Sequence, residues 1–124
     1  MDSDQLRRRT KEFARRIVKL VAALPNDRRG DVIGSQVLKS GTSIGANYRE
    51  ALRASSKKHF ISILQIVLRE ADETHYWLEI LSESGIVKAE QLKDLTDECY
   101  QLIAIFASTI KTAKSGPEIL NLKS

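Results

Sequence analysis

The stretch FISILQIVLREADETHYWLEIL, residues 60–81, repeats apolar side chains at the spacing of an α-helix. Residues three and four apart share one face of a helix, and such a stripe packs against a protein core. The inner stripe consists of Phe60, Ile63, Leu64, Val67, Ala71, Thr74, Leu78 and Leu81. This stretch is the strongest helix prediction in the chain, and it sets the fold class as all-α.

Residues at both ends of this segment mark where the helix begins and where it ends. Ser55 or Ser56 can cap the first turn, because a hydroxyl accepts a hydrogen bond from a backbone N–H that has no helical partner. Gly85 suits the left-handed conformation that ends many helices, and Ile86 is then placed to contact Leu81 in a Schellman motif.

Three more segments show the same periodicity, so we expect helices near residues 4–24, 31–53, 56–84 and 89–114. Short connections force neighbouring helices to run in opposite directions, which predicts an antiparallel up-down four-helix bundle. At 124 residues the chain fits a single domain, residues 1–124. Gly116-Pro117 cannot continue the last helix, so we expect a loose tail from about residue 115.

The second helix contains Gly34, Gly41 and Gly45 in its interior. Each glycine there costs about 1 kcal/mol relative to alanine. Either this helix packs very closely on a neighbour or it bends locally, and we favour close packing.

Charge is distributed unevenly along the chain. Residues 1–58 hold 14 Lys and Arg and 6 Asp and Glu, net +8, whereas residues 59–124 hold 6 and 10, net −4. A clustered basic surface can follow a phosphate backbone, although an ordinary solvated face is the competing interpretation. The predicted nucleic-acid-binding set is Arg7, Arg8, Arg15, Arg16, Lys19, Arg28, Arg29, Arg49, Arg53, Lys57 and Lys58.

The third helix carries more apolar residues than one inner stripe needs, and such a surplus often marks a subunit interface. The extra residues are Ile61, Ile66, Leu68, Trp77 and Ile80. We expect a homo-oligomer with Ile66, Trp77 and Ile80 at the contact. Tyr48, on the inner side of the second helix, is a further interface candidate, and burial in a broad core is the alternative for the whole set.

No constellation of residues points to catalysis. Gly41-Thr42-Ser43-Ile44-Gly45 matches the G-x-S-x-G string of hydrolases, but that motif needs a strand before the serine, and Ser43 is expected inside a helix. Asp72 and His75 form only one of the two carboxylate-histidine pairs that a di-iron bundle requires. We expect no enzyme activity, no cofactor and no metal.

The apolar stretches are far shorter than the roughly 20 residues of a membrane span. No signal peptide is evident, and Cys99 is the only cysteine. We therefore expect a soluble, cytoplasmic protein.

Three segments carry a family resemblance: LKSGTSIGANYREA at residues 38–51, RASSKKHF at residues 53–60 and LREADETHYWL at residues 68–78. Together they resemble the four-helix-bundle proteins of the 23S rRNA intervening-sequence family. Ala51 departs from the glycine frequent at that place, which suggests a more continuous second helix. The resemblance implies a cytosolic, non-catalytic bundle that assembles as a homopentamer, and accessory proteins of diversity-generating retroelements are similar in fold and bind nucleic acid.

The charge distribution and the apolar surplus lead us to expect a homo-oligomeric ring that holds RNA or DNA phosphates without reading sequence, and the resemblance makes a pentamer the preferred count. In such a ring, the basic side of one subunit would meet the acidic side of its neighbour. The alternative is a scaffold whose basic face docks a protein partner such as a reverse transcriptase.

Overall fold

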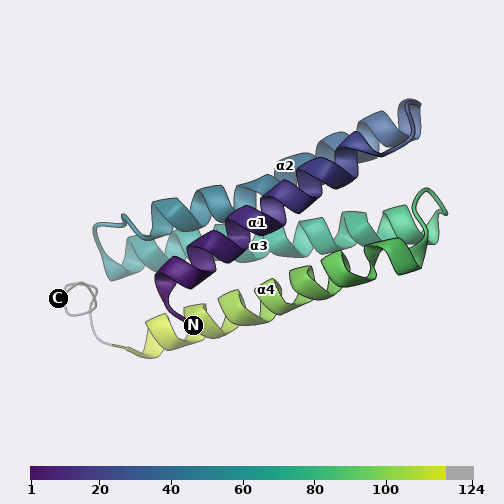
Figure 1. Cartoon of the computed structure of the whole chain (residues 1–124). Helices are drawn as coiled ribbons and strands as arrows, with labels where there is room; N and C mark the ends of the chain where they lie inside the picture. The colour runs from purple at the N-terminus through teal and green to yellow at the C-terminus, as the bar shows by residue number, and fades with distance from the viewer. Residues whose placement is uncertain (117–124) are drawn as a thin grey trace.

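The computed structural model describes residues 1–116, and within that range it contains four α-helices and no strand. They are α1 (Ser3–Ala22), α2 (Arg28–Ala51), α3 (Lys57–Glu83) and α4 (Ala89–Ser115). Each helix runs antiparallel to the one before it (Figure 1). The all-α four-helix prediction is confirmed, while the tail from residue 117 onward lies outside the described residues. None of the four helices is long and apolar enough to span a membrane.

Side-chain caps fix where the helices begin. At α1, Asp2 accepts from the Gln5 backbone N–H at 2.8 Å while the Gln5 side chain accepts from the Asp2 N–H at 3.0 Å, which is a capping box. Ser56, one of the two predicted caps of α3, accepts from the His59 N–H at 3.0 Å. At α2, Asp27 accepts from the Gly30 N–H at 3.0 Å, so this helix begins three residues before the predicted start.

The end of α3 has the predicted Schellman motif. Gly85 adopts φ = 75°, the left-handed conformation that glycine tolerates best. The Ile86 N–H donates to the Leu81 carbonyl at 3.1 Å, and the Gly85 N–H donates to the Ser82 carbonyl at 3.1 Å. The chain therefore reverses tightly between α3 and α4.

The inner stripes of all four helices form one apolar core. Its largest fully buried side chains include Phe13, Ile17, Ile44, Leu64, Leu78, Leu102 and Phe106. Two buried hydroxyls, Ser40 Oγ and Thr74 Oγ1, hydrogen-bond to each other at 2.9 Å between α2 and α3. This pairing removes the cost of burying them unpaired.

Helices α1 and α2 pack very closely, as the glycines of α2 predicted. A β-carbon added at Gly41 would lie 2.8 Å from Ile17 Cγ1, and one at Gly34 would lie 3.1 Å from Leu24 Cδ1. These separations are shorter than normal carbon–carbon contacts, so the glycines let the two backbones approach. Close packing, rather than a local bend, explains them.

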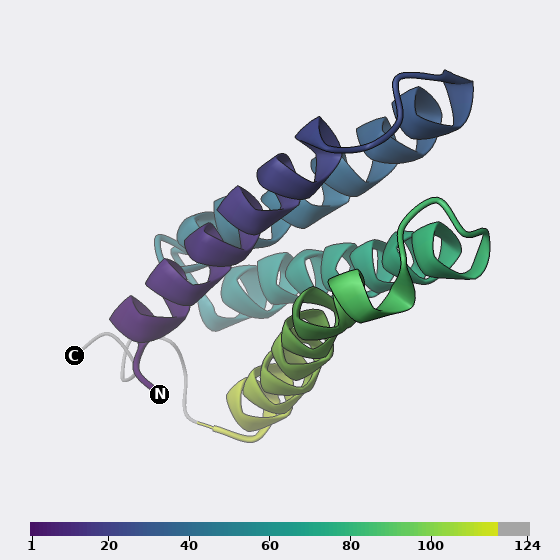
Figure 2. The same cartoon turned by 45° about the vertical axis from the view of Figure 1, so that its right-hand side comes forward.

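The seam between α1 and α4 is the loosest of the bundle. These helices contact each other much less than α1 contacts α2, α2 contacts α3, or α3 contacts α4. In both views the carboxyl-terminal part of α1 runs alongside α2 and away from α4 (Figures 1 and 2). The basic residues of α1 that face α4 therefore border an open seam rather than a packed interface.

Candidate nucleic-acid interface

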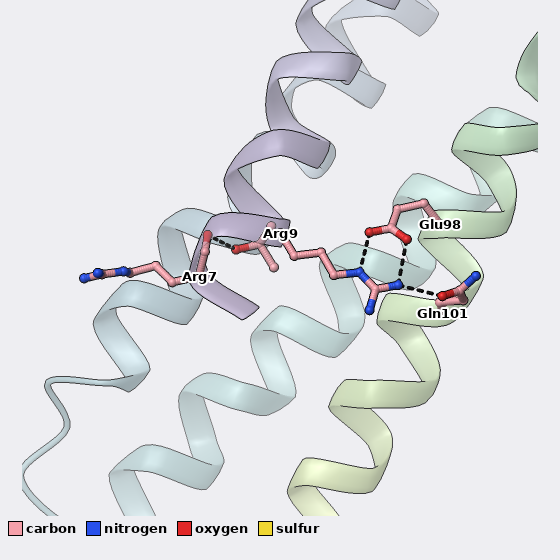
Figure 3. Close-up of polar contacts among 5 residues, drawn as sticks. Arg7, Arg9, Glu98 and Gln101 are labelled. Carbon is pink, nitrogen blue, oxygen red and sulfur yellow. Dashed lines mark hydrogen bonds and ion pairs between the residues drawn. The ribbon is translucent and has the colours of Figure 1, made fainter. Parts of the chain in front are cut away.

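The cationic residues of α1 point to different sides of that helix. Residues two apart on a helix lie on nearly opposite faces, since each residue turns the chain by about 100°. Arg7 and Arg9 accordingly extend in opposite directions (Figure 3). The structure therefore divides the predicted basic set into separate groups.

One group forms a hollow at the end of the bundle that carries the amino terminus of α1. The hollow has a volume of about 270 Å³ and is lined by Arg7, Arg49, Leu52 and Arg53. Arg49 lies in the last turn of α2, Arg53 lies in the turn that follows this helix, and Arg7 lines the same hollow from the first turns of α1. No acidic residue lines this hollow, and among the hollows described in residues 1–116 it is the one that brings together three arginines of the predicted set without an acidic residue.

The guanidinium groups of this hollow are largely unneutralised. Arg7 Nη2 lies 3.1 Å from Asp4 Oδ1, in a pair whose partners are both exposed. Such exposed pairs contribute little, and the other N–H donors of Arg7 stay available. Within residues 1–116, neither Arg49 nor Arg53 has an ion-pair partner.

Arg9 is committed to a structural contact instead. Its Nε donates to Glu98 Oε2 at 2.6 Å, and its Nη2 donates to Glu98 Oε1 at 2.7 Å and to Gln101 Oε1 at 2.6 Å (Figure 3). The two side chains of the ion pair are only 23% and 18% exposed. The hydrogen bond to Glu98 raises the pKa of Arg9. This two-point contact ties α1 to α4 across the loose seam and leaves Arg9 unable to serve as a free phosphate ligand.

Arg8 and Arg16 face the same seam, next to acidic residues. They line a hollow of about 350 Å³ together with Gln5, Arg9, Glu12, Phe13 and Glu98. Glu12 and Glu98 offset part of the positive charge there, so this group is a weaker anion site than the three-arginine hollow.

Lys19 borders a larger cleft, of about 570 Å³, between the carboxyl-terminal part of α1 and the start of α4. Most of its lining is apolar, and the lining residues are Arg16, Lys19, Leu20, Ala23, Leu24, Ile86, Val87, Gln91, Leu92, Asp94 and Leu95. Asp94 is acidic, so the rim of this cleft carries both signs of charge.

The remaining arginines of the set are dispersed. Arg15 lies 3.4 Å from Glu12 in an exposed pair. Arg28 and Arg29 lie at the start of α2. Since a helix rises by about 1.5 Å per residue, they lie about 30 Å from Arg49 at the other end of this helix. Arg29 also pairs with the capping residue Asp27 at 2.9 Å, which lowers the pKa of that carboxyl group.

The two lysines at the start of α3 have different environments. Lys57 Nζ donates to the Gly116 carbonyl at 2.5 Å, which ties the start of α3 to the end of α4. Lys58 is exposed, and both lysines border a shallow hollow of about 480 Å³ together with Ile61, Ser62 and Gln65. Of these two lysines, only Lys58 has no hydrogen-bond or ion-pair partner for its ammonium group within residues 1–116.

The three α3 residues predicted at a subunit contact are partly buried in this single chain. Trp77 packs against the core, and its Nε1 lies 3.4 Å from Glu73 Oε2. Ile66 and Ile80 are half-buried outside the core cluster. Core packing thus accounts for part of the apolar surplus, and the interface role of these residues stays a prediction.

Tyr48 does not present a surface for a partner. It is 4% exposed, and its ring lies edge-on against Phe106 at a centroid distance of 5.4 Å. Burial raises its pKa, with Asp2 adding to the shift. The prediction that Tyr48 lies on the inner side of α2 is confirmed. Its inclusion among the interface candidates was wrong, because the side chain is buried in the core of its own chain.

Two features of the surface have no counterpart in the sequence prediction. Leu52 lines the three-arginine hollow. The sequence could have indicated this, because Leu52 lies three residues after Arg49 and directly before Arg53. Tyr76 and Tyr100 are 53% and 66% exposed on α3 and α4. Neither tyrosine lines a hollow with the arginines of α1 and α2.

The hydrolase-like string lies wholly within α2. Ser43 Oγ donates to the Lys39 carbonyl at 2.6 Å, one turn earlier in the same helix. In residues 1–116 no three His, Cys, Asp or Glu side chains come close enough together to hold a metal ion. His75, the partner considered for Asp72, lies instead 3.1 Å from Glu79 Oε1.

Comparison with known proteins places these features in context. A sequence model of the 23S rRNA-intervening sequence protein family matches residues 4–108. The crystal structure of a protein of unknown function from the S23 ribosomal protein family of Bacteroides thetaiotaomicron is 41% identical, with a TM-score of 0.84. The match covers 90% of this chain and all of that one. A search of curated proteins found no match.

Proposed function

Because the chain belongs to the 23S rRNA-intervening sequence protein family, we propose that it is a non-catalytic cytoplasmic module that binds RNA or DNA through phosphate contacts. The observation that carries this proposal is the hollow in which Arg7, Arg49 and Arg53 meet without an acidic lining residue. Arginine suits such a role because its planar guanidinium can donate two hydrogen bonds to one phosphate.

The proposed binding does not read base sequence. Phosphate contacts carry no sequence information, whereas readout needs side chains directed at base edges or aromatic rings for stacking. The exposed tyrosines Tyr76 and Tyr100 lie on α3 and α4, apart from the arginine hollow. Affinity should therefore depend on salt far more than on sequence.

Binding of fluorescent RNA and DNA duplexes at low salt tests this proposal. The wild-type protein is compared with Arg49→Glu and Arg53→Glu, and with Arg69→Glu as a control, since Arg69 is exposed on α3 outside every predicted group. We expect Arg49→Glu and Arg53→Glu each to lose at least about tenfold in affinity, because each replaces an attraction with a repulsion. Equal affinity for all four proteins would remove the hollow from the proposal, and absence of binding by the wild-type protein would refute it.

We further propose that the chain assembles into a homo-oligomer, with a pentamer as the preferred count. The half-buried Ile66 and Ile80 and the partly buried Trp77 support a contact on α3. The net charges of +8 for residues 1–58 and −4 for residues 59–124 suit a ring in which unlike faces meet. Several copies of one phosphate site on a common particle would bind a long strand more tightly than a single copy. Light scattering that shows a monomer at micromolar concentration would refute the assembly, whereas a dimer would refute only the count.

The apolar cleft between α1 and α4 favours one alternative function, that of a scaffold for a protein partner. Leu20, Leu24, Ile86 and Val87 line the cleft, and Lys19 and Arg16 border it. Such a site suits an acidic segment with apolar side chains. Under this alternative, Lys19→Glu would weaken partner binding, whereas changes in the three-arginine hollow would not.

A further inference from the structure

The three-arginine hollow concentrates more positive charge than one internal phosphate of a nucleic acid supplies. Arg7, Arg49 and Arg53 contribute three guanidinium groups, and the exposed Asp4 is the only carboxylate paired with any of them in residues 1–116. An internal phosphodiester carries one negative charge. A phosphomonoester carries about 1.5 to 2 negative charges at pH 7 and has three acceptor oxygens.

The size of the hollow also suits a small terminal group. Its volume of about 270 Å³ lies below the roughly 300–1,000 Å³ typical of sites that enclose a whole ligand. Leu52 is its one apolar lining residue and is partly exposed. A phosphate can therefore lie among the guanidinium groups while the adjoining sugar contacts Leu52.

The arginines are also placed to bind from two helices at once. Arg49 extends from the last turn of α2, Arg53 extends from the turn directly after it, and Arg7 extends from the first turns of α1. A group with three acceptor oxygens can receive donors from all these directions, whereas a diester has only two free oxygens.

From these features we propose that the hollow binds a terminal phosphomonoester, so that the protein prefers phosphorylated ends of RNA or DNA strands to internal phosphodiesters. This inference rests on the proposed nucleic-acid binding and assigns a substrate class to its central site.

Four strands of one sequence test the inference: a linear strand with a 5′-phosphate, one with a 3′-phosphate, one with hydroxyl groups at both ends, and a covalently closed circle. Each unlabelled strand competes with an internally labelled probe for the wild-type protein. We expect the phosphorylated linear strands to bind about tenfold more tightly than the other two, equivalent to ~1.4 kcal/mol. Equal affinities for all four strands would overturn the end preference and leave nucleic-acid binding intact. No binding of any strand at low salt would overturn both.

Variants connect the preference to the hollow. Arg49→Gln and Arg53→Gln should abolish the difference between phosphorylated and hydroxyl ends, whereas the matched control Arg69→Gln should keep it. Removing one of several like charges relieves repulsion, so the first two variants should melt at or above the wild-type temperature. A preference that survives both substitutions would place the end-binding site elsewhere and contradict the assignment.

Inorganic phosphate separates a strand end from a free anion. It should raise the melting temperature of the wild-type protein above that in chloride of equal ionic strength, and should not do so for Arg49→Gln. Its affinity should stay well below that of the phosphorylated strand, because the strand adds contacts outside the hollow. Equal affinity of phosphate and the phosphorylated strand would assign the hollow to a free anion and overturn the assignment to strand ends.

Discussion

Cys99 lies within α4 on the side that packs against α3, and it is fully buried. Its Sγ donates to the Ala71 carbonyl at 3.3 Å. Burial raises the pKa of this thiol to about 12, and the nearby carboxylates of Asp72 and Glu98 add to the effect. A protonated, enclosed thiol is a poor nucleophile, so Cys99 acts as a packing residue.

We therefore predict that a thiol reagent at pH 8 modifies the native protein no faster than the protein unfolds, and reaches full modification only in denaturant. In the unfolded chain the thiol ionises near pH 9, while in the folded chain it stays protonated to about pH 12. The free energy of unfolding should consequently fall as pH rises through this window, and Cys99→Ala should remove that part of the slope. Rapid modification of the native protein would show that the α3–α4 contact opens.

The contact of α1 with α2 depends on the missing β-carbon of Gly41. Gly41→Ala gains about 1 kcal/mol of helix propensity. The added atom would nevertheless lie 2.8 Å and 2.9 Å from the two γ-carbons of Ile17, which is fully buried and cannot move aside. Overpacking of this kind costs about 1–3 kcal/mol, so we predict a net loss of ~1 kcal/mol in urea unfolding. The double variant Gly41→Ala with Ile17→Ala should lose less stability than the two single variants lose together, because the two side chains occupy the same space. A stabilised Gly41→Ala protein would contradict the close packing.

The pair of Arg9 and Glu98 is the main polar contact between α1 and α4. Glu98→Gln leaves a mostly buried guanidinium without its counter-ion, so we predict a loss of about 1–2 kcal/mol in the free energy of unfolding. Arg9→Lys should recover little of the pair, because lysine cannot make the two-point contact. As a control, Arg15→Gln disrupts an exposed pair and should leave stability unchanged. Similar effects of Glu98→Gln and Arg15→Gln would mean that the α1–α4 seam does not depend on this contact.

At the level of the whole molecule, the sequence predicts those features that depend on nearby residues. The stripe of α3, its serine cap and the turn at Gly85 follow from periodicity and from residues within one or two turns. The predicted start of α2 at residue 31 is three residues late, because the prediction did not use Asp27 as a cap, and this side chain accepts from the Gly30 N–H.

Features that depend on tertiary contacts were not predictable in the same way. Arg7 and Arg9 belong to the same run of three arginines, and the sequence around them does not tell which one forms an ion pair. Only in the folded chain does Arg9 contact Glu98 while Arg7 lines a hollow with Arg49. Tyr48 fits both an inner stripe and an interface until its ring is placed against Phe106. The predicted basic surface likewise consists of several separate groups, because helix geometry distributes neighbouring arginines to different sides.

The salt dependence of nucleic-acid binding tests the central claim most directly. The affinity of a duplex is measured from about 50 to 200 mM salt, and the slope of its logarithm against the logarithm of the salt concentration reports the number of phosphates neutralised. We predict a steep slope for the wild-type protein and a reduction of about one for each of Arg7→Gln, Arg49→Gln and Arg53→Gln, with none for Arg69→Gln. A slope near zero, or one that these three substitutions leave unchanged, would contradict phosphate binding at the three-arginine hollow.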